Sequence, residues 1–330
     1  MSKELDIVGL GNALMDALVV LPDDSLLQQQ NLKKGEMHMA GNERWQEVYS
    51  ALGDLDISLQ TGGSCANTIA ILGLLGAKTS YCSQVGNDEF GKLYTEQLID
   101  ALGQHAVIVS EQDATGKCLS LISQNAERTL VTDLGAAIQL PSIDHFAQDI
   151  RSSQLLYLTG YLMFGDMRKR MMSAIAIAKE AGVKVALDVA DPGVIAAMKE
   201  DMYEVIRDHV DMVFLNQSEA QSLCGGTPES AIEELSQYCE IVVVKMGSKG
   251  SMVCRGNEKV FSDIVKVDAV DTTGAGDSYA AGFLYGWIND WSLQKSADLG
   301  SRIASAVVSQ LGAVIRDRSR LAGFVQEING

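Results

Sequence analysis

The chain is poor in proline, cysteine and histidine, and each shortage excludes a class of protein or site. Only 4 of the 330 residues are proline, and no proline-rich or serine-rich stretch separates the chain into parts. The 6 cysteines are scattered without a Cys-x-x-Cys pair, and the 4 histidines form no cluster with the spacing of metal ligands. A flexible linker, a disulfide framework and a zinc site are therefore not indicated. We expect residues 1–330 to form a single domain with reduced cysteines.

Basic residues are also in short supply. The 26 lysines and arginines are outnumbered by 43 aspartates and glutamates, which gives a formal net charge of −17. Nucleic acid is excluded as a partner, because no basic stripe balances the acidic residues. The first residues show no signal-peptide pattern, and the longest apolar runs are about half of the roughly 20 residues that a membrane span requires. The sequence therefore predicts a cytoplasmic globular protein that acts on a small molecule and binds no membrane.

Strand-like and helix-like segments alternate along most of the chain. Continuous apolar runs, such as 212–215 and 241–245, are typical of buried parallel strands. The alternation predicts βαβ units, and so an α/β fold in which helices cover both faces of a mostly parallel sheet. The strands are expected at residues 5–10, 79–85, 107–110, 155–159, 183–188, 212–215 and 241–245, and the helices at 67–76, 88–102, 168–181, 194–208 and 279–288.

Three segments interrupt this alternation with short β-type runs that have no helix between neighbours: 13–21, 36–40 and 117–133. In the last segment, residues 117–123 and 128–133 flank a polar stretch in the manner of a β-hairpin. We interpret the three segments as a small β-lid attached to the main domain.

The most informative stretch is Asp-Thr-Thr-Gly-Ala-Gly-Asp at residues 271–277, just before the apolar helical pattern. The first N–H groups of a helix have no intrahelical partner, and the helix dipole makes that end positive. Glycines also allow the backbone to approach a bound group closely. Residues 274–277 therefore form a candidate anion pocket, with Asp277 as a candidate base for a hydroxyl proton. The simpler interpretation is a glycine turn whose first-turn aspartate complements the helix dipole.

Two other glycine motifs fit known phosphate-binding patterns poorly. Residues 9–11 follow the first strand, but Leu14 stands where a dinucleotide fingerprint needs its third glycine. Residues 86–92 resemble a P-loop, but Leu93 stands where the hydroxyl that holds magnesium is needed. Gly91 and Lys92 fit the inside of a helix better than a phosphate loop.

Further candidate residues lie at or after expected strand ends, where α/β enzymes bind nucleotides. Gly62 and Gly63 precede a helix in which Asn67 can both donate and accept hydrogen bonds to vicinal hydroxyls. Asn216 and Glu219 share one helical face and offer the oxygen atoms that magnesium prefers. The simpler interpretations are a helix capped by Ser64 in the first case and an ordinary helix start in the second.

Two further segments, 245–250 and 12–16, also follow expected strands. Lys245, Gly247 and Gly250 come after an apolar strand and can pass along a triphosphate, or form an ordinary hairpin turn. Asp16, which follows Asn12, lies inside an apolar run, where a carboxylate needs a partner unless it faces solvent from an edge strand.

Together and in this order, these segments resemble the ribokinase-like (PfkB) family of carbohydrate and nucleoside kinases along nearly the whole chain. Residues 62–91 are similar to the family's N-terminal signature, and residues 271–277 are similar to its C-terminal signature. The resemblance implies a ribokinase-like, three-layer α/β/α domain with a β-lid over the substrate. It also implies a kinase that uses ATP and Mg²⁺.

The resemblance assigns roles to individual residues. Asp277 would activate the acceptor hydroxyl, and the N–H groups of Gly274, Ala275, Gly276 and Asp277 would hold the transferring phosphoryl group. Asn216 and Glu219 match the motif that organises magnesium. The remaining assignments are nucleotide contacts at Asn216, Lys245, Gly247, Gly250, Thr273, Ser301 and Ala304, and substrate contacts at Asn12, Asp16, Met39, Gly62, Gly63, Asn67, Arg128 and Tyr161.

Within the family, residues 11–16 are most similar to the adenosine kinase subfamily, as is the length of chain between Asp16 and Gly62. The expected acceptor is therefore a nucleoside that receives phosphate on its 5′-hydroxyl, while Asp16 and Asn67 hold its ring hydroxyls. Arg128 is similar to an arginine of the lid that lies near the phosphates, and Tyr161 to an aromatic residue that stacks on the base.

Several alternatives stay open. Asp188 and Asp191 depart from the adenosine kinase pattern and are compatible with a sugar kinase that acts on ribose, fructose or a keto sugar. A non-catalytic, ligand-sensing protein of the same fold is a third hypothesis. The sequence does not decide whether a monovalent cation such as K⁺ binds near Asp271 and Thr273, or whether the protein is a monomer or a homodimer.

Overall fold

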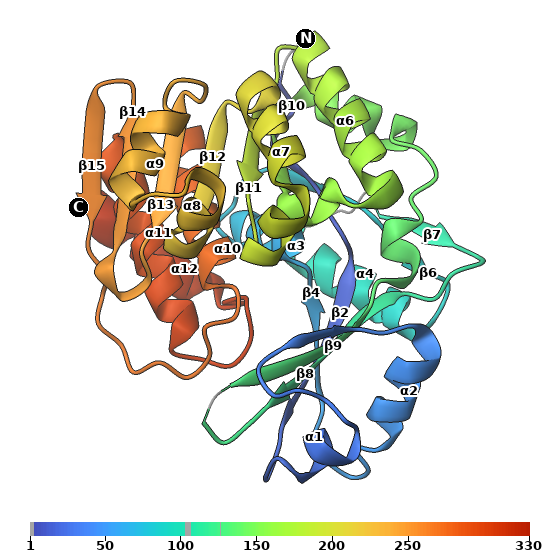
Figure 1. The fold of residues 1–330 in the computed structure, drawn as a ribbon. Coiled ribbons are helices and arrows are strands. Elements are labelled where there is room, and N and C mark those ends of the chain that lie inside the picture. Colours follow the sequence, from blue (N-terminus) through green and yellow to red (C-terminus); the bar gives the residue numbers. More distant parts are fainter. Residues whose placement is uncertain (1–2, 103–106, 126) are drawn as a thin grey trace.

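The computed structural model describes residues 3–102, 107–125 and 127–330, and it shows a large α/β body with a smaller β-sheet beside it (Figure 1). Among the described residues, the sheet of the body has eight strands, of which six are parallel and two form an antiparallel edge. Their order is β15 (Glu258–Ser262), β14 (Ser251–Arg255), β13 (Ile241–Lys245), β12 (Met212–Asn216), β11 (Lys184–Asp188), β10 (Ser153–Thr159), β1 (Leu5–Leu10) and β5 (Thr79–Cys82). The predicted α/β fold with a mostly parallel sheet is confirmed.

Alternate side chains of each central strand face opposite layers of helices. On β12, Phe214 packs in one layer, and Val213 and Leu215 pack in the other. Strands that are covered on both faces are apolar throughout, which explains the continuous apolar runs in the sequence. One layer holds α3 (Ser64–Leu74), α4 (Glu89–Leu102), α10 (Ala275–Ile288), α11 (Leu293–Val308) and α12 (Arg318–Asn329), and the other holds α5 (Ala147–Ser152), α6 (Gly165–Glu180), α7 (Pro192–His209), α8 (Gln217–Cys224) and α9 (Pro228–Leu235). No helix among the described residues is both long and apolar enough to cross a membrane.

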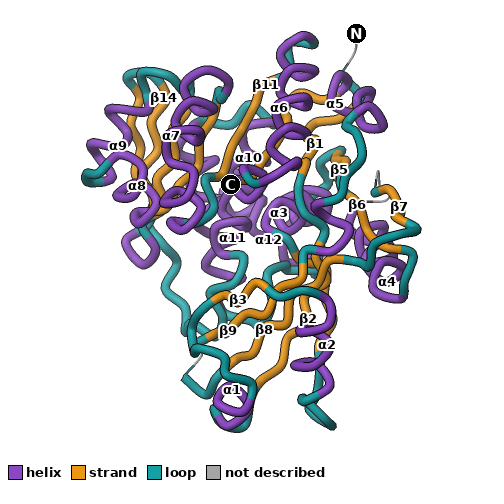
Figure 2. Tube along the Cα trace, turned by 45° about the vertical axis from the view of Figure 1, so that its right-hand side comes forward, coloured by secondary structure: helices purple, strands orange, loops and turns teal. Residues whose placement is uncertain are grey.

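The segments 13–21, 36–40 and 117–133 come together in a second sheet, which we call the lid and which lies below the body in Figure 2. One face of the lid packs against Trp45, with Leu119 and Leu121 beside it. The sequence does not predict the strand β4 or the two helices of the lid. The lid strands, in spatial order, are β3 (Met37–Met39), β9 (Arg128–Asp133), β8 (Gly116–Ile122), β2 (Leu14–Val20) and β4 (Ser58–Gly62), and the helices are α1 (Ser25–Gln29) and α2 (Asn42–Ser50).

The prediction of one strand over residues 79–85 is wrong. The structure has β5 and then β6 (Gln84–Gly86), which pairs with β7 (Ile108–Ser110) in a separate sheet. Ser83 lies at the break, where its hydroxyl donates to the carbonyl oxygen of Gly11 at 2.7 Å and accepts from the N–H of Ala13 at 2.9 Å. Such side-chain hydrogen bonds compete with the regular pairing of a strand.

The stretch that resembles a P-loop leads into α4, and Gly91 lies inside the helix, as predicted. The carboxylate of Asp88 accepts hydrogen bonds from the N–H groups of Gly91 and Thr115, both at 2.8 Å, and from the Thr115 hydroxyl at 2.6 Å. A Cβ atom at Gly91 would lie 2.1 Å from the carbonyl oxygen of Gly86, so only glycine fits there. Burial favours the neutral acid, but the bonds from Thr115 and Gly91 hold the pKa of Asp88 below its usual value. Asp88 thus ties the start of α4 to the start of β8.

We expect Asp88→Ala to lower the free energy of unfolding by about 2–3 kcal/mol, because two N–H groups and a hydroxyl lose a charged acceptor. Urea denaturation followed by circular dichroism measures the change. Asp54→Ala, at an exposed turn of the lid, is the control and should change stability little. Equal stability of the two variants would show that Asp88 contributes nothing to the fold.

Candidate active site

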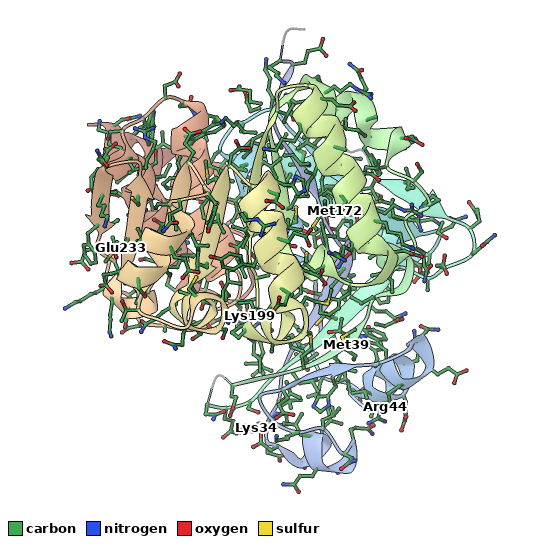
Figure 3. The ribbon with its side chains drawn as sticks, turned by 45° about the horizontal axis from the view of Figure 1, so that its top comes forward. Lys34, Met39, Arg44, Met172, Lys199 and Glu233 are labelled. Atoms are coloured by element: carbon green, nitrogen blue, oxygen red, sulfur yellow. The ribbon has the colours of Figure 1, made fainter. Side chains whose placement is uncertain are left out.

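A cavity of about 1520 Å³ lies between the lid and the carboxyl ends of the parallel strands. It is lined by the inner face of the lid, by the ends of β11, β12 and β13, and by the first turns of α3 and α10. In Figure 3, Met39 lies where the lid meets the body, whereas Lys34 and Arg44 lie farther out on the lid. All site residues predicted from the sequence line this cavity except Gly62.

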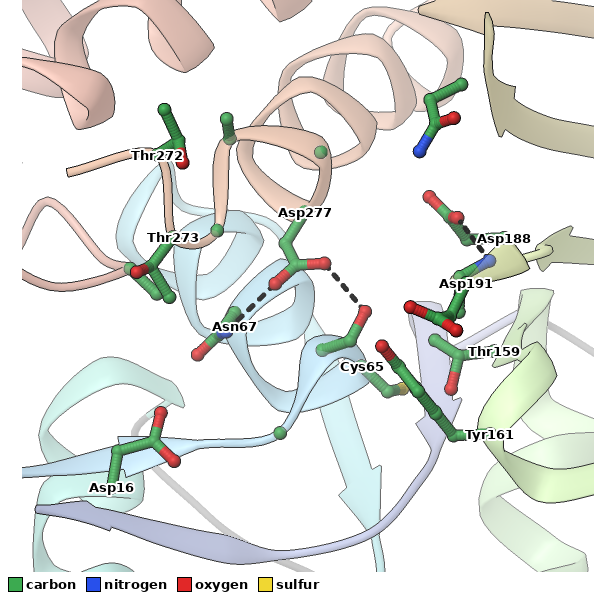
Figure 4. A pocket seen from close by; sticks show the side chains of 18 of the residues that line it. Asp16, Cys65, Asn67, Thr159, Tyr161, Asp188, Asp191, Thr272, Thr273 and Asp277 are labelled. Atoms are coloured by element: carbon green, nitrogen blue, oxygen red, sulfur yellow. Dashed lines mark hydrogen bonds between the residues drawn. The ribbon is translucent and has the colours of Figure 1, made fainter. Parts of the chain in front are cut away.

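Asp277 lies in the first turn of α10 and is held by two side chains of α3 (Figure 4). Ser64 donates its hydroxyl hydrogen to one carboxylate oxygen at 2.6 Å, and Asn67 donates from its amide nitrogen to the other at 2.9 Å. Burial raises the pKa of Asp277 to about 6, although the hydrogen bonds from Ser64 and Asn67 oppose this change. The side chain is therefore a fixed carboxylate whose affinity for a proton is higher than that of an ordinary aspartate.

Ser64 is a residue of the candidate site that the sequence interpretation did not include. The sequence suggests that Ser64 caps a helix, but the N-cap of α3 is Gly63, and no side-chain bond caps it. The Ser64 hydroxyl binds Asp277 instead. The only signal in the sequence is the position of Ser64 next to a glycine pair at a helix start, which does not identify a partner 213 residues away.

Asp16 and Asn12 reach the cavity because two glycines make room for them. A Cβ atom at Gly62 would lie 2.2 Å from the carboxylate carbon of Asp16, and one at Gly63 would lie 2.2 Å from the carbonyl oxygen of Asn12. Gly62 therefore lies against Asp16 and does not line the cavity itself. Burial raises the pKa of Asp16 to about 7, against the lowering effect of Arg128.

Two amide oxygen atoms beside Asp16 lack partners. The side-chain oxygens of Asn12 and Asn67 are buried and have no hydrogen-bond partner among the described residues. Both side chains line the cavity, and both oxygens can only accept hydrogen bonds. A ligand at this position would have to supply donors, such as hydroxyl groups.

The start of α10 is the candidate anion site, and one of its predicted donors, the N–H of Ala275, is already bonded. Gly274 adopts a left-handed conformation, with φ of 69°, and the N–H of Ala275 donates to the carbonyl oxygen of Thr272 at 3.3 Å. Gly276 and the N–H of Asp277 follow in the first turn, where intrahelical partners are lacking. A Cβ atom at Gly276 would lie 3.1 Å from the Nζ atom of Lys245, so the glycine leaves space for the ammonium group beside the helix start.

Lys245 forms a buried ion pair that the sequence does not reveal. Its Nζ atom lies 2.6 Å from a carboxylate oxygen of Asp188, and only 13% of the lysine side chain is exposed. The two residues close β13 and β11, which are separated only by β12 in the sheet. Burial opposes the charge on Lys245, but Asp188, Glu219 and Asp277 raise the pKa of Lys245 above its usual value. A charged ammonium group is therefore held next to the start of α10.

Asn216 and Glu219 form a capping box at the start of α8. The N–H of Asn216 donates to Glu219 at 2.7 Å, and the N–H of Glu219 donates to the side-chain oxygen of Asn216 at 2.9 Å. The simpler structural interpretation, an ordinary helix start, is thus correct for the local geometry. Glu219 is 1% exposed, and burial raises the pKa of Glu219 although Lys245 opposes this. Both side chains still line the cavity and offer oxygen atoms to it.

Arg128 extends from the lid to the loop before α10. Its Nε atom lies 3.6 Å from a carboxylate oxygen of Asp271, which also accepts a bond from the N–H of Thr273 at 2.9 Å. The other oxygen of Asp271 accepts from the N–H of Gly312 at 3.1 Å. Burial favours the neutral acid, but bonds from Thr273 and Gly312 hold the pKa of Asp271 below its usual value. Asp271 and Thr273 are thus bonded to each other and to the protein.

The remaining predicted residues lie farther along the cavity. The backbone of Gly250 lies so close to that of Ser262 that a Cβ atom added at Gly250 would lie 2.1 Å from the carbonyl oxygen of Ser262. Ser262 in turn donates its hydroxyl hydrogen to Ser301 at 2.9 Å. Gly247, Ala304 and Tyr161 also line the cavity.

Known proteins resemble this chain in sequence and in structure. The adenosine kinase of Sinorhizobium meliloti is 30% identical and superposes with a TM-score of 0.87, over 98% of this chain and 99% of that one. A ribokinase of Haemophilus influenzae is 28% identical over 76% of this chain and 82% of the relative. A 5-dehydro-2-deoxygluconokinase of Geobacillus thermodenitrificans is 27% identical over 75% of this chain and 78% of the relative. These relatives are named as kinases, and the chain adopts the ribokinase-like fold, which matches the adenosine kinase structure.

The sequence also matches the pattern of a protein family over most of its length. Residues 35–319 match the pfkB family carbohydrate kinase, so the match includes the first turns of both α3 and α10. This span is most of the chain and contains Asp277 with both of its hydrogen-bond partners. The protein therefore belongs to the pfkB family of carbohydrate kinases and is a kinase.

Proposed function

We propose that this kinase transfers the terminal phosphoryl group of ATP to the 5′-hydroxyl of a nucleoside, with Asp277 as the general base. The observation that carries the proposal is the fixed, partly buried carboxylate of Asp277 beside the start of α10. A carboxylate with a raised pKa accepts a hydroxyl proton more readily than an ordinary aspartate. The positive end of the helix next to it suits the phosphoryl group that the hydroxyl would attack.

The residues around Asp277 fit the rest of the transfer. The Lys245 ammonium group lies against Gly276 and can neutralise negative charge that develops at the helix start. Gly247, Gly250, Thr273, Ser301 and Ala304 would hold the nucleotide farther along the cavity. Closure of the lid over the cavity would exclude water, which otherwise competes as an acceptor.

Asn216 and Glu219 fit a magnesium ion. Their oxygen atoms line the cavity near Lys245, and Mg²⁺ prefers oxygen ligands and keeps several of its waters. Because the side-chain amide of Asn216 also donates to the carboxylate of Glu219, the two side chains suit an ion that is held partly through water. When bound, magnesium would neutralise charge on the phosphate groups of the nucleotide.

The acceptor end of the cavity supports a nucleoside. The free oxygens of Asn12 and Asn67, together with the carboxylate of Asp16, accept hydrogen bonds and suit the vicinal hydroxyls of a pentose. Met39, in the same row across the lid strands as Asp16, and Tyr161 of the body also line the cavity and suit a flat, largely apolar base. The 30% identity to an adenosine kinase over 98% of this chain adds support.

A sugar kinase is the second candidate, because the ribokinase and the 5-dehydro-2-deoxygluconokinase above carry sugar-kinase names. An anionic acceptor, such as a sugar phosphate, fits less well. Carboxylates line the cavity, and two of its cations, Arg128 and Lys245, are paired with Asp271 and Asp188, whereas the third, Lys266, is exposed. An acceptor without negative charge is therefore favoured.

Measurement of ATP consumption with nucleosides, ribose, fructose and 2-keto sugars, each with and without potassium, tests the proposed acceptor. We expect turnover with nucleosides, because only they fill both the hydroxyl-binding and the apolar part of the cavity. Asp16→Ala should raise the KM for the nucleoside roughly 10- to 100-fold and leave the KM for ATP nearly unchanged, because a charged hydrogen-bond partner is lost. Turnover with sugars alone would favour the second candidate.

We expect Asp277→Asn to lower kcat by about 10²–10⁴-fold, because an amide cannot accept the hydroxyl proton. Binding of nucleoside and ATP should persist, which isothermal titration calorimetry can check. The control is Asp166→Asn at the rim of the cavity, where the carboxylate pairs with Lys169 on an exposed surface. An Asp277→Asn enzyme within a few-fold of the wild type would remove Asp277 from the role of base.

The pH dependence of kcat provides an independent test. Because the base acts when deprotonated and the pKa of Asp277 is about 6, activity should fall as the pH drops through that value. Ser64→Ala removes a hydrogen bond that lowers this pKa, so the acidic limb should move to higher pH by roughly 0.5–1 unit. Ser142→Ala, which removes an exposed hydroxyl bonded to Asp144, should leave the profile in place. A Ser64→Ala profile that coincides with the wild type would contradict the role of this bond.

A further inference from the structure

The inner face of the lid presents a flat, mainly apolar surface to the cavity. Strand register places Leu18 on β2, Ser120 on β8, Leu130 on β9 and Met37 on β3 in one row across four neighbouring strands. All four side chains line the cavity. Because alternate residues of a strand share one face, this row belongs to the same surface as Asp16.

Ser120 is the polar member of this row, and its hydroxyl has no partner. The residue is 5% exposed, and its Oγ atom makes no hydrogen bond with any described residue. By contrast, the hydroxyl of Thr132, also on this face, donates to the Sγ atom of Cys118 at 3.2 Å. A buried hydroxyl without a hydrogen-bond partner destabilises a folded protein. The presence of Ser120 at this position is explained if a bound ligand supplies the missing partner.

The distance from Ser120 to the hydroxyl-binding residues limits which ligand can reach it. Asp16 pairs with Cys118 in the row next to that of Ser120. Neighbouring rows are two residues apart along a strand, or about 6.6 Å. A ligand whose hydroxyls are held at Asp16 and Asn67 therefore reaches Ser120 through a second group beyond its hydroxylated ring.

Aromatic residues of the body line the cavity from another side. Tyr161 belongs to the short helix η3 (Gly160–Met163), and Phe164 follows directly after it. In Figure 4, Tyr161 and Asp16 lie on opposite sides of Asp277. Tyr161 and Phe164 thus line the cavity from the body, whereas the row that contains Ser120 lines it from the lid.

We propose that Ser120 is a specificity-determining residue whose hydroxyl forms a hydrogen bond with a polar ring atom of the acceptor's heterocyclic base. The inference rests on the proposed function, in which the acceptor is a nucleoside. A residue on β8 of the lid would thus distinguish an acceptor whose base has a polar edge from an acceptor whose base lacks one. A site built to bond a polar atom discriminates against analogues that lack this atom, because its own polar group is then left unpaired.

The test is the binding of adenosine to the full-length protein, measured by calorimetry without ATP, together with the thermal unfolding temperature. Ser120→Ala should weaken adenosine binding about 5- to 10-fold, as expected for one hydrogen bond. It should leave the unfolding temperature unchanged or raise it, because the removed hydroxyl has no partner in the free protein.

Ser153→Ala is the matched control, since Ser153 is buried outside the cavity and donates its hydroxyl hydrogen to the carbonyl oxygen of Ile150 at 2.9 Å. This variant should show the opposite pattern, with a lower unfolding temperature and unchanged adenosine binding.

Two outcomes would overturn the role of Ser120 while the proposed function stands. One is unchanged adenosine binding in Ser120→Ala, and the other is a weaker affinity accompanied by a lower unfolding temperature, which indicates a structural role. If the wild-type protein binds none of adenosine, guanosine, cytidine and uridine, the proposed function itself fails, and the inference fails with it.

Discussion

The site depends on one partly buried carboxylate, which lies where two helices begin. Asp277 of α10 receives hydrogen bonds from Ser64 and Asn67 of α3, and the Thr68 hydroxyl donates to the backbone oxygen of Asp277 at 3.2 Å. A buried charge is costly unless it is bonded, and the positive ends of two helix dipoles reduce this cost further. The contact fixes α3, which follows the lid strand β4, relative to α10, whose start is the candidate anion site. In the proposed function, the same packing would set both the base and the place of the phosphoryl group.

The opposite wall of the site is set by the parallel sheet. Because β11, β12 and β13 are parallel neighbours, their carboxyl ends bring Asp188, Asn216 and Lys245 to one edge. The ion pair between Asp188 and Lys245 keeps the ammonium group charged in a buried place. Gly276 then allows this charge to lie against the start of α10. Strand order thus supplies a cation to a cavity that is otherwise rich in carboxylates.

The lid has its own small core around Trp45, and its inner face carries Asp16 and Ser120. In the proposed function, the lid would contribute to acceptor recognition, whereas the start of α10 would serve phosphoryl transfer. This division fits a family in which relatives with different substrate names share one framework. Changes on the inner face of the lid can alter the acceptor without disturbing the contact between α3 and α10.

The sequence by itself determined the features that depend on short stretches of chain. Apolar periodicity was enough for the parallel sheet and its two helix layers, and the glycines before Asp277 marked the start of α10. The tertiary structure alone decided which distant groups meet: Ser64 with Asp277 over 213 residues, and Lys245 with Asp188 over 57 residues. It also decided that the run 79–85 breaks at Ser83 and that the Ser120 hydroxyl is left without a partner. The reason is physical: a local pattern records the preference of each residue for a helix, a strand or the interior, whereas hydrogen-bond partners, ion pairs and pKa values depend on which surfaces pack together.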